Sequence, residues 1–214
     1  MSFVRIRAQV SRWRILAILC VLLSALAVMV SPAQAQTQAR TQTPARTLAG
    51  TEVNFYNVAT EWCADLPNYG ATYNSYVYQH ACDYTSGDNQ QWEIVPTRSV
   101  DVGGTRQDLF LIRNVKSRQC MDLPGSGANP ATTPIWMHKC IATDDNQEWF
   151  FMPGNSGGWY YVNLAANMCL DVPGWARDGS DKGNPNPLTI YPCWDKDWAF
   201  DGADDHLWIL RQLA

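Results

Sequence analysis

The apolar residues of this chain fall into two kinds of segment. Near the N-terminus, one long apolar run extends from Ile15 to Val30. Beyond residue 50, aromatic and β-branched residues gather instead in short runs such as Val53 to Val58, Leu109 to Val115 and Trp159 to Leu164, with Gly, Pro and Asn between them. Such runs are typical of short strands, and no segment shows a long apolar pattern with the helical period of about 3.6 residues. The pattern therefore predicts an all-β domain.

One motif with two cysteines occurs three times among these predicted strands. It consists of Cys-x-Asp-[Leu/Val]-Pro, a second Cys, and a Gln/His-x-Trp triplet. The copies begin at Cys63, Cys120 and Cys169, their triplets end at Trp92, Trp149 and Trp208, and Asn57, Asn114 and Asn163 lie six residues before each first Cys. A period of roughly 50 to 60 residues indicates units that bury a shared core. Three pseudo-symmetric copies of about four strands predict a β-trefoil, a small closed barrel capped by hairpins, with the three Trp residues in its core.

The repeat also predicts the pairing of the cysteines. Six cysteines follow residue 35, and six allow fifteen pairings. The repeat selects one disulfide per copy: Cys63 with Cys82, Cys120 with Cys140, and Cys169 with Cys193. Each bond closes a loop of about 20 residues and should contribute on the order of 3 kcal/mol. Zinc binding is the less favoured alternative, because these spacings differ from the close Cys-x-x-Cys pairs of structural zinc sites.

The N-terminal segment predicts export. Four arginines precede the apolar run, and Ala33-Gln34-Ala35 is a small-residue cleavage pattern, so residues 1–35 are expected to be a signal peptide cleaved after Ala35. A membrane anchor is the alternative, but 16 residues from Ile15 to Val30 span only about 24 Å of a hydrocarbon core of about 30 Å. The protein should therefore be secreted, to an extracellular or periplasmic space where disulfides persist.

Composition divides the mature chain into a leader and one domain. Residues 36–50 are rich in Thr, Gln, Ala and Arg and contain no aromatic residue, which predicts a flexible leader. Residues 51–214 have the size of one all-β domain and leave no room for a separate catalytic domain. After cleavage, 12 basic and 20 acidic residues give a net charge of −8. Such an acidic chain is unsuited to nucleic acid or to anionic membranes, and stable membrane insertion is not expected.

The three registered copies resemble the ricin B-chain type of lectin domain, whose repeats are named for Gln-x-Trp. The resemblance covers about Val53 to Leu210, nearly the whole mature domain. It implies a shallow sugar pocket in each repeat, built from the Asp after the first Cys, an aromatic residue two positions before the second Cys, and the Asn before the Gln. A carboxylate accepts hydrogen bonds from adjacent hydroxyls, an amide both donates and accepts, and a ring stacks on the C–H face of a sugar. Galactose-type glycans are the family's usual ligands.

The resemblance assigns candidate sugar-binding residues to each repeat. The first repeat supplies Asp65, His80 and Asn89, with Gln90 orienting the Asp. The second supplies Asp122, His138 and Asn146, with Gln147 in the same role. The third supplies Asp171 and Tyr191, but Asp205 and His206 replace the expected Asn and Gln. We expect one or two working pockets, because each repeat departs from the pattern.

These departures leave structural alternatives open. His80 and His138 offer smaller stacking surfaces than Trp or Tyr, and Tyr78 and Trp136, four residues before the second Cys, could supply the missing ring. Asp205 would repel Asp171 in the third repeat. Alternatively, the three Asp residues hold turns before Leu/Val-Pro, the glutamines are buried struts, and the two histidines are ordinary surface residues.

The third repeat contains an acidic and aromatic insertion. Its acidic and amide side chains are Asp178, Asp181, Asn184, Asp195, Asp197, Asp201 and Asp204. Calcium binding is conceivable, but the spacing does not match a Ca²⁺ loop and solvated loops are favoured, so no metal or cofactor is predicted. The aromatic residues Trp175, Trp194, Trp198 and Phe200 either extend a binding surface or pack the insertion against the barrel.

Two other functions are alternatives to glycan binding. No His-Glu-x-x-His or phosphate-loop motif is present, and all three histidines occupy repeat positions, so an enzyme is not predicted. The second alternative is a protein-binding trefoil, either a toxin's delivery subunit or an inhibitor of a secreted hydrolase, with an unknown partner chain.

Overall fold

The computed structural model describes residues 48–68, 74–143, 146–154, 157–174, 181–183, 186–193 and 205–212. All of them belong to one compact unit, Thr43–Ala214. The expected signal peptide, most of the expected leader and most of the insertion lie outside the described residues. Within the described part of the chain, no helix is long and apolar enough to cross a membrane.

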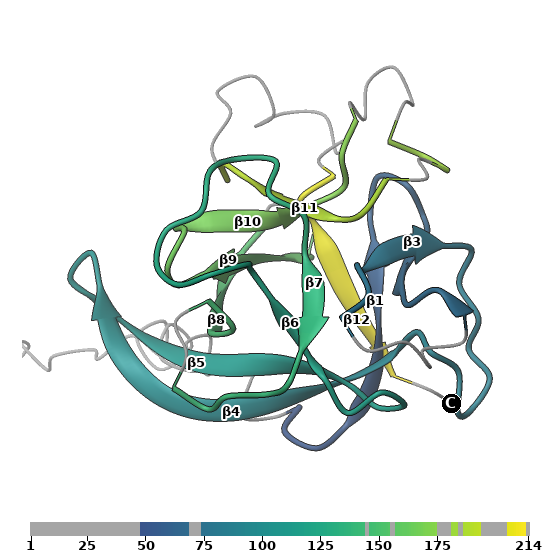
Figure 1. Ribbon diagram of the computed structural model, residues 1–214, viewed down its shortest axis with the longest axis horizontal. Coiled ribbons are helices and arrows are strands. Elements are labelled where there is room, and N and C mark those ends of the chain that lie inside the picture. Colours follow the sequence, from purple (N-terminus) through teal and green to yellow (C-terminus); the bar gives the residue numbers. More distant parts are fainter. Residues whose placement is uncertain are drawn as a thin grey trace, which may run out of the picture. The chain divides into compact units, whose positions relative to one another are not determined.

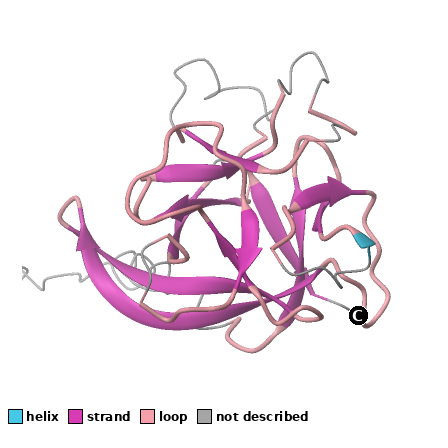
Figure 2. Cartoon of the chain, viewed as in Figure 1, coloured by secondary structure: helices cyan, strands magenta, loops and turns pink. Residues whose placement is uncertain are grey.

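The described chain contains four strands in each repeat (Figures 1 and 2). The first repeat has β1 (Glu52–Asn57), β2 (Cys63–Asp65), β3 (Tyr78–His80) and β4 (Gln91–Val102). The second has β5 (Thr105–Asn114), β6 (Cys120–Asp122), β7 (Trp136–His138) and β8 (Trp149–Pro153). The third has β9 (Trp159–Asn163), β10 (Met168–Asp171), β11 (Thr189–Tyr191) and β12 (Trp208–Gln212).

Six of these strands close a barrel. Antiparallel pairing runs from β12 to β1, β4, β5, β8 and β9 and returns to β12. The other six form one short hairpin per repeat: β2 with β3, β6 with β7, and β10 with β11. The hairpins are joined by a ring of backbone bonds, from Val77 N to Ile135 O (3.0 Å), Ile135 N to Leu188 O (2.8 Å) and Leu188 N to Val77 O (2.7 Å). The expected β-trefoil is therefore confirmed.

The tryptophan of each triplet lies in the core. Trp92, Trp149 and Trp208 are completely buried, together with Phe55, Phe110, Phe151 and Tyr161 in the barrel. The indole nitrogens of Trp92 and Trp208 each donate to the carbonyl of the residue after the first Cys, at 3.1 Å. The indole nitrogen of Trp149 has no hydrogen-bond partner among the described residues. The three copies thus share a core position but differ in one polar contact.

The three predicted disulfides are present, each within its own repeat: Cys63–Cys82, Cys120–Cys140 and Cys169–Cys193. Each bond ties the first strand of a hairpin to the loop after its second strand. On the N-terminal side, Leu48 packs against the core and Ala49 forms a parallel bridge with Ile94. Ordered packing therefore begins slightly before the expected boundary at Thr51.

Candidate functional site

The short hairpin of each repeat places the candidate residues on one face. Residues paired across two strands point their side chains to the same side of the sheet. The residue paired with the candidate Asp differs in the three repeats: it is Tyr78 for Asp65, Trp136 for Asp122 and Thr189 for Asp171. Two positions further on, His80, His138 and Tyr191 pair with the first Cys of each repeat. Each Asp therefore lies near two side chains, one from each of these positions.

In the first repeat, these residues surround a cavity of about 700 Å³. Its lining includes all four predicted residues, which are Asp65, His80, Asn89 and Gln90. Tyr78, proposed from the sequence as a substitute ring, also lines it. Further lining residues without a counterpart in the repeat motif are Asn68, Asp83 and Asp88. The structure thus brings the whole first-repeat set into one concave site.

Hydrogen bonds fix the polar groups of this first pocket. The amide nitrogen of Asn89 donates to Oδ1 of Asp65 at 2.9 Å, and also to the carbonyl of Leu66. Gln90 donates to the carbonyl of Ala81 at 3.0 Å and accepts from the backbone N–H of Asp83 at 2.8 Å. Gln90 therefore holds the loop around the second Cys, and its side chain also bonds to the Asp65 carboxyl. Asn89 holds the carboxylate.

Burial changes the protonation of the first pocket. Desolvation raises the pKa of Asp65 from 3.8 to about 6, and Asp88 pushes it in the same direction. The nearby charge of His80 and a hydrogen bond from Gln90 oppose this rise. At pH 7.5 the carboxylate is still ionised, but it is less hydrated than an ordinary surface Asp. Such a group is a good acceptor for ligand hydroxyls, because little water must be removed from it.

The second repeat has the same frame with a more buried Asp. Asp122 is 7 % exposed, and its Oδ2 lies 3.7 Å from Nδ1 of His138. Asn146 donates to the carbonyl of Leu123 at 3.1 Å. Gln147 donates to the carbonyl of Lys139 at 3.0 Å and accepts from the N–H of Ile141 at 2.9 Å, so it supports its loop as Gln90 does.

Trp136, which pairs with Asp122 across the second hairpin, has a neighbouring ring from another repeat. Tyr76 of the first repeat forms a β-bridge with it, and the two rings are stacked with centroids 6.5 Å apart and planes inclined by 23°. Tyr76 is exposed, whereas Trp136 is partly buried. Ring surface is therefore available near the second pocket from residues other than His138.

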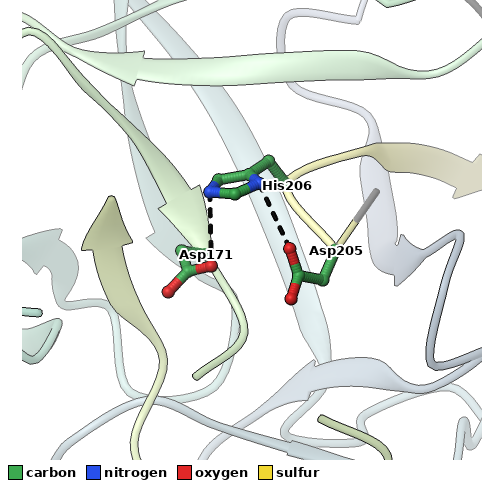
Figure 3. A group of neighbouring side chains, drawn as sticks. All are labelled: Asp171, Asp205 and His206. Atoms are coloured by element: carbon green, nitrogen blue, oxygen red, sulfur yellow. Dashed lines mark ion pairs between the residues drawn. The ribbon is translucent and has the colours of Figure 1, made fainter. Parts of the chain in front are cut away.

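In the third repeat, the protein itself surrounds the candidate Asp (Figure 3). Oδ2 of Asp171 accepts a hydrogen bond from the Thr189 hydroxyl at 2.5 Å, and its Oδ1 lies 3.4 Å from Nε2 of His206. The other ring nitrogen, Nδ1, lies 3.2 Å from Oδ1 of Asp205. Asp171, Asp205 and His206 are only 6 %, 2 % and 4 % exposed. Both carboxylate oxygens of Asp171 are thus engaged inside the protein.

His206 changes the electrostatics expected for the third repeat. The imidazole lies between Asp171 and Asp205, with one ring nitrogen facing each carboxylate, and so separates the two acids (Figure 3). Tyr191, the best stacking residue of the three by type, keeps 37 % of its surface exposed, with its ring 6.0 Å from that of His206. The ring is accessible, but the carboxylate beside it is not.

Asp171, Asp205 and His206 also form the one group in the described part of the chain that is close enough to share a metal ion, with ligand atoms within 4.8 Å of one another. The two carboxylates face different nitrogens of the ring. Calcium prefers six to eight oxygens and fits this set poorly. The geometry is that of an ion-pair network. Of the residues considered for calcium, only Asp181 is described, and it is buried.

Comparisons with known proteins agree with the β-trefoil fold. Residues 100–184 match the family described as ricin-type beta-trefoil lectin domain-like. No curated protein is matched by its sequence. The resemblance to this lectin family is therefore confirmed over these residues by the family match.

Solved structures share the fold at low sequence identity. The designed threefold-symmetric protein ThreeFoil is similar with a TM-score of 0.55 and 18 % identity, over 76 % of this chain and 99 % of that one. The Rhizoctonia solani agglutinin has a TM-score of 0.52 and 17 % identity, over 76 % and 94 %. The cytolethal distending toxin of Haemophilus ducreyi has a TM-score of 0.54 and 14 % identity, over 77 % and 84 %.

Proposed function

Because the protein carries a ricin-type β-trefoil lectin-like domain, we propose that it is a secreted lectin that binds galactose-type or related glycans without chemical turnover. The observation that carries this proposal is the first pocket, a cavity of about 700 Å³. There Asp65 is held by the Asn89 amide at 2.9 Å and is flanked by Tyr78 and His80. These groups offer an acceptor, an amide and ring surface within one concave site.

Each group has a role in recognising a sugar. The ionised carboxylate of Asp65 accepts hydrogen bonds from two neighbouring hydroxyls. The Asn89 amide nitrogen is used within the protein, so its oxygen is the group left to accept from a ligand hydroxyl. Tyr78 and His80 place ring surface beside the C–H face of the sugar. A few such bonds and one stacked ring correspond to an affinity on the millimolar scale for a single sugar.

The three repeats are not equivalent in this proposal. The first pocket is the main site, because its Asp is partly open and lines a cavity. The second has a more buried Asp with Trp136 and Tyr76 nearby, and we assign it a weaker subsite. The third has no free carboxylate to offer, since Asp171 is held by Thr189 and His206. Two sites on one rigid body favour branched or polymeric glycans through effective concentration.

Export and the absence of turnover rest on sequence features. The expected signal peptide and three disulfides suit an oxidising compartment. Two carboxylates on either side of a glycosidic bond belong in one cleft, whereas these Asp residues lie on separate hairpins. Glycans are the proposed partners; the acidic chain is unsuited to nucleic acid, and no stable membrane insertion of the mature protein is proposed.

The test is a glycan array probed with the full chain after expression into an oxidising compartment, at pH 7.5, with calcium and with chelator. We expect selective binding that survives chelation. The selected glycan is then titrated by calorimetry against Asp65→Ala, Asp122→Ala and Asp171→Ala. Loss should be largest for the first variant and absent for the third. No binding by well-folded protein would contradict the proposal and favour a protein-binding trefoil with a toxin or hydrolase partner.

A further inference from the structure

The Asn that lies six residues before each first Cys makes the same contacts in all three repeats. Asn57, Asn114 and Asn163 are completely buried. The side-chain oxygen of each accepts two backbone N–H groups of the turn that follows, at 3.0 to 3.1 Å. Each Asn thus closes a turn within its own repeat. This is the ordinary structural use of an Asn side chain at a turn.

The side-chain nitrogen makes a second contact, which crosses to the preceding repeat. Asn114 donates to the carbonyl of Asn89 at 2.8 Å, and Asn163 donates to the carbonyl of Asn146 at 2.9 Å. Asn57 donates to the carbonyl of Asp205 at 2.6 Å, which completes the circle from the first repeat back to the third. The accepting residue is always the one before the Gln/His of the triplet. In the first two repeats, this is the Asn proposed to contact sugar.

Backbone bonds reinforce this connection. The residue after each Asn donates its N–H to the carbonyl of the middle residue of the same triplet, at 2.9 Å from Val58, Val115 and Leu164. Asn114 also donates to the carbonyl of Gln91 at 3.1 Å. The backbone of residues 89 to 91 is therefore fixed from the second repeat. A buried carbonyl that loses its donor costs free energy, so the segment would move to find another.

We propose that Asn114 is a positioning residue of the first pocket, and that each pocket is aligned by the repeat that follows it. The inference rests on the proposed function. Asn114 touches no ligand; it holds the main chain of Asn89, whose amide in turn lies 2.9 Å from Oδ1 of Asp65. In the same way, Asn163 aligns the second pocket and Asn57 aligns the third repeat. Specificity at one pocket thus depends on a buried residue of its neighbour.

The chain offers a matched control for this role. Asn163 has the same burial, the same turn contacts and the corresponding donor contact to the preceding repeat, and Asn114 differs by its additional bond to the carbonyl of Gln91. The side-chain nitrogen of Asn163 donates to the second repeat, and its turn leads into the hairpin of the third repeat. Asn163 therefore contacts no residue of the first pocket. Asn57 is a less suitable control, because its turn leads directly into β2 and Asp65. If Asn114 has a purely structural role, Asn114→Ala and Asn163→Ala should change glycan affinity equally.

The experiment compares these two variants in an Asp122→Ala background, where the second pocket contributes nothing. Calorimetry with the array-selected glycan should show about tenfold weaker binding for Asn114→Ala, the loss expected from one misplaced hydrogen-bonding group. Asn163→Ala should bind within about twofold of its parent, although both variants unfold at similarly reduced temperatures. Equal affinity of the two variants, whether retained or lost, would overturn the proposal.

A second readout does not depend on any ligand. NMR titration of the Asp65 carboxyl should show a higher midpoint in Asn114→Ala than in Asn163→Ala, because a carboxylate that loses a hydrogen bond is more easily protonated. If the wild-type protein binds no glycan, the proposed function fails, while this titration still decides whether Asn114 aligns Asn89 with Asp65. The same midpoint in both variants would refute the alignment. If the Ala variants do not fold, Asn114→Ser and Asn163→Ser take their place.

Discussion

Replacing Asp65 by Asn should stabilise the fold and abolish binding to the first pocket. The two side chains have the same shape, and the oxygen of the introduced amide can still accept the hydrogen bond from Asn89 that Asp65 accepts at 2.9 Å. The substitution removes the negative charge that burial makes costly. It also removes the ionised acceptor that the proposed sugar contact requires. A residue kept for a structural turn would show the opposite effect on stability.

The magnitude follows from the titration of Asp65. Burial raises its pKa from 3.8 to about 6, so the folded state holds the proton more tightly than the unfolded chain. The resulting stabilisation is complete below about pH 4 and is lost as the pH rises through about 6. The full linkage would be about 3 kcal/mol; because the carboxylate is partly solvated, about 1 kcal/mol is a reasonable expectation. At pH 7.5, Asp65→Asn should therefore melt about 2–4 °C higher than wild type.

Glycan affinity should also depend on the ionisation of Asp65. The ionised fraction of Asp65 falls about tenfold between pH 7.5 and pH 5, and glycan affinity should fall with it. The charged or titratable groups around the carboxylate are His80, Asp83, Asp88 and Tyr78. Measuring glycan affinity against pH in His80→Asn shows which part of the pH dependence comes from Asp65.

Melting curves and calorimetric titrations at pH 4, 5, 6 and 7.5 measure both effects together. The stability difference between Asp65→Asn and wild type should vanish near pH 4. Asp171→Asn is the control, because its carboxylate is engaged by Thr189 and His206; it should lose stability and keep its binding. If Asp65→Asn melts lower than wild type at pH 7.5, or still binds glycan, the reasoning is wrong.

Three further substitutions test the packing of the fold. His206→Ala should cost about 3–5 kcal/mol in urea denaturation, because it leaves two buried carboxylates without the imidazole that lies beside both; a loss below about 1 kcal/mol would refute this role. Trp92→Phe should cost about 1 kcal/mol more than Trp149→Phe, since only the first indole donates a hydrogen bond; equal losses would count against it. Replacing Cys120 and Cys140 together by Ser should cost about 3 kcal/mol and lower the melting temperature by roughly 10 °C, and an unchanged melting temperature would contradict a structural disulfide.

The sequence predicts the symmetric features of this protein, because the motif repeats them. Strand number, barrel closure, disulfide pairing and the buried tryptophans all follow from three registered copies. The first-pocket residues could be predicted for the same reason. Tyr78, four residues before Cys82, could be predicted as an additional ring and lines the cavity. The recurring Asn was visible in the sequence, but its role was not. Its contact crosses to another repeat, to a carbonyl that carries no sequence identity.

The engagement of Asp171 within the protein could not be predicted from the motif of the third repeat. The residue that decides it, Thr189, lies outside the motif. The position opposite the candidate Asp holds Tyr78, Trp136 or Thr189. In the third repeat it is the Thr hydroxyl that donates to the Asp, at 2.5 Å, with an imidazole on the other oxygen. In the first repeat the residue opposite the Asp is a ring that lines the cavity, and the Asp bonds to Asn89 instead. The same backbone frame therefore places the carboxylate on the wall of a cavity in one repeat and engages it within the protein in another.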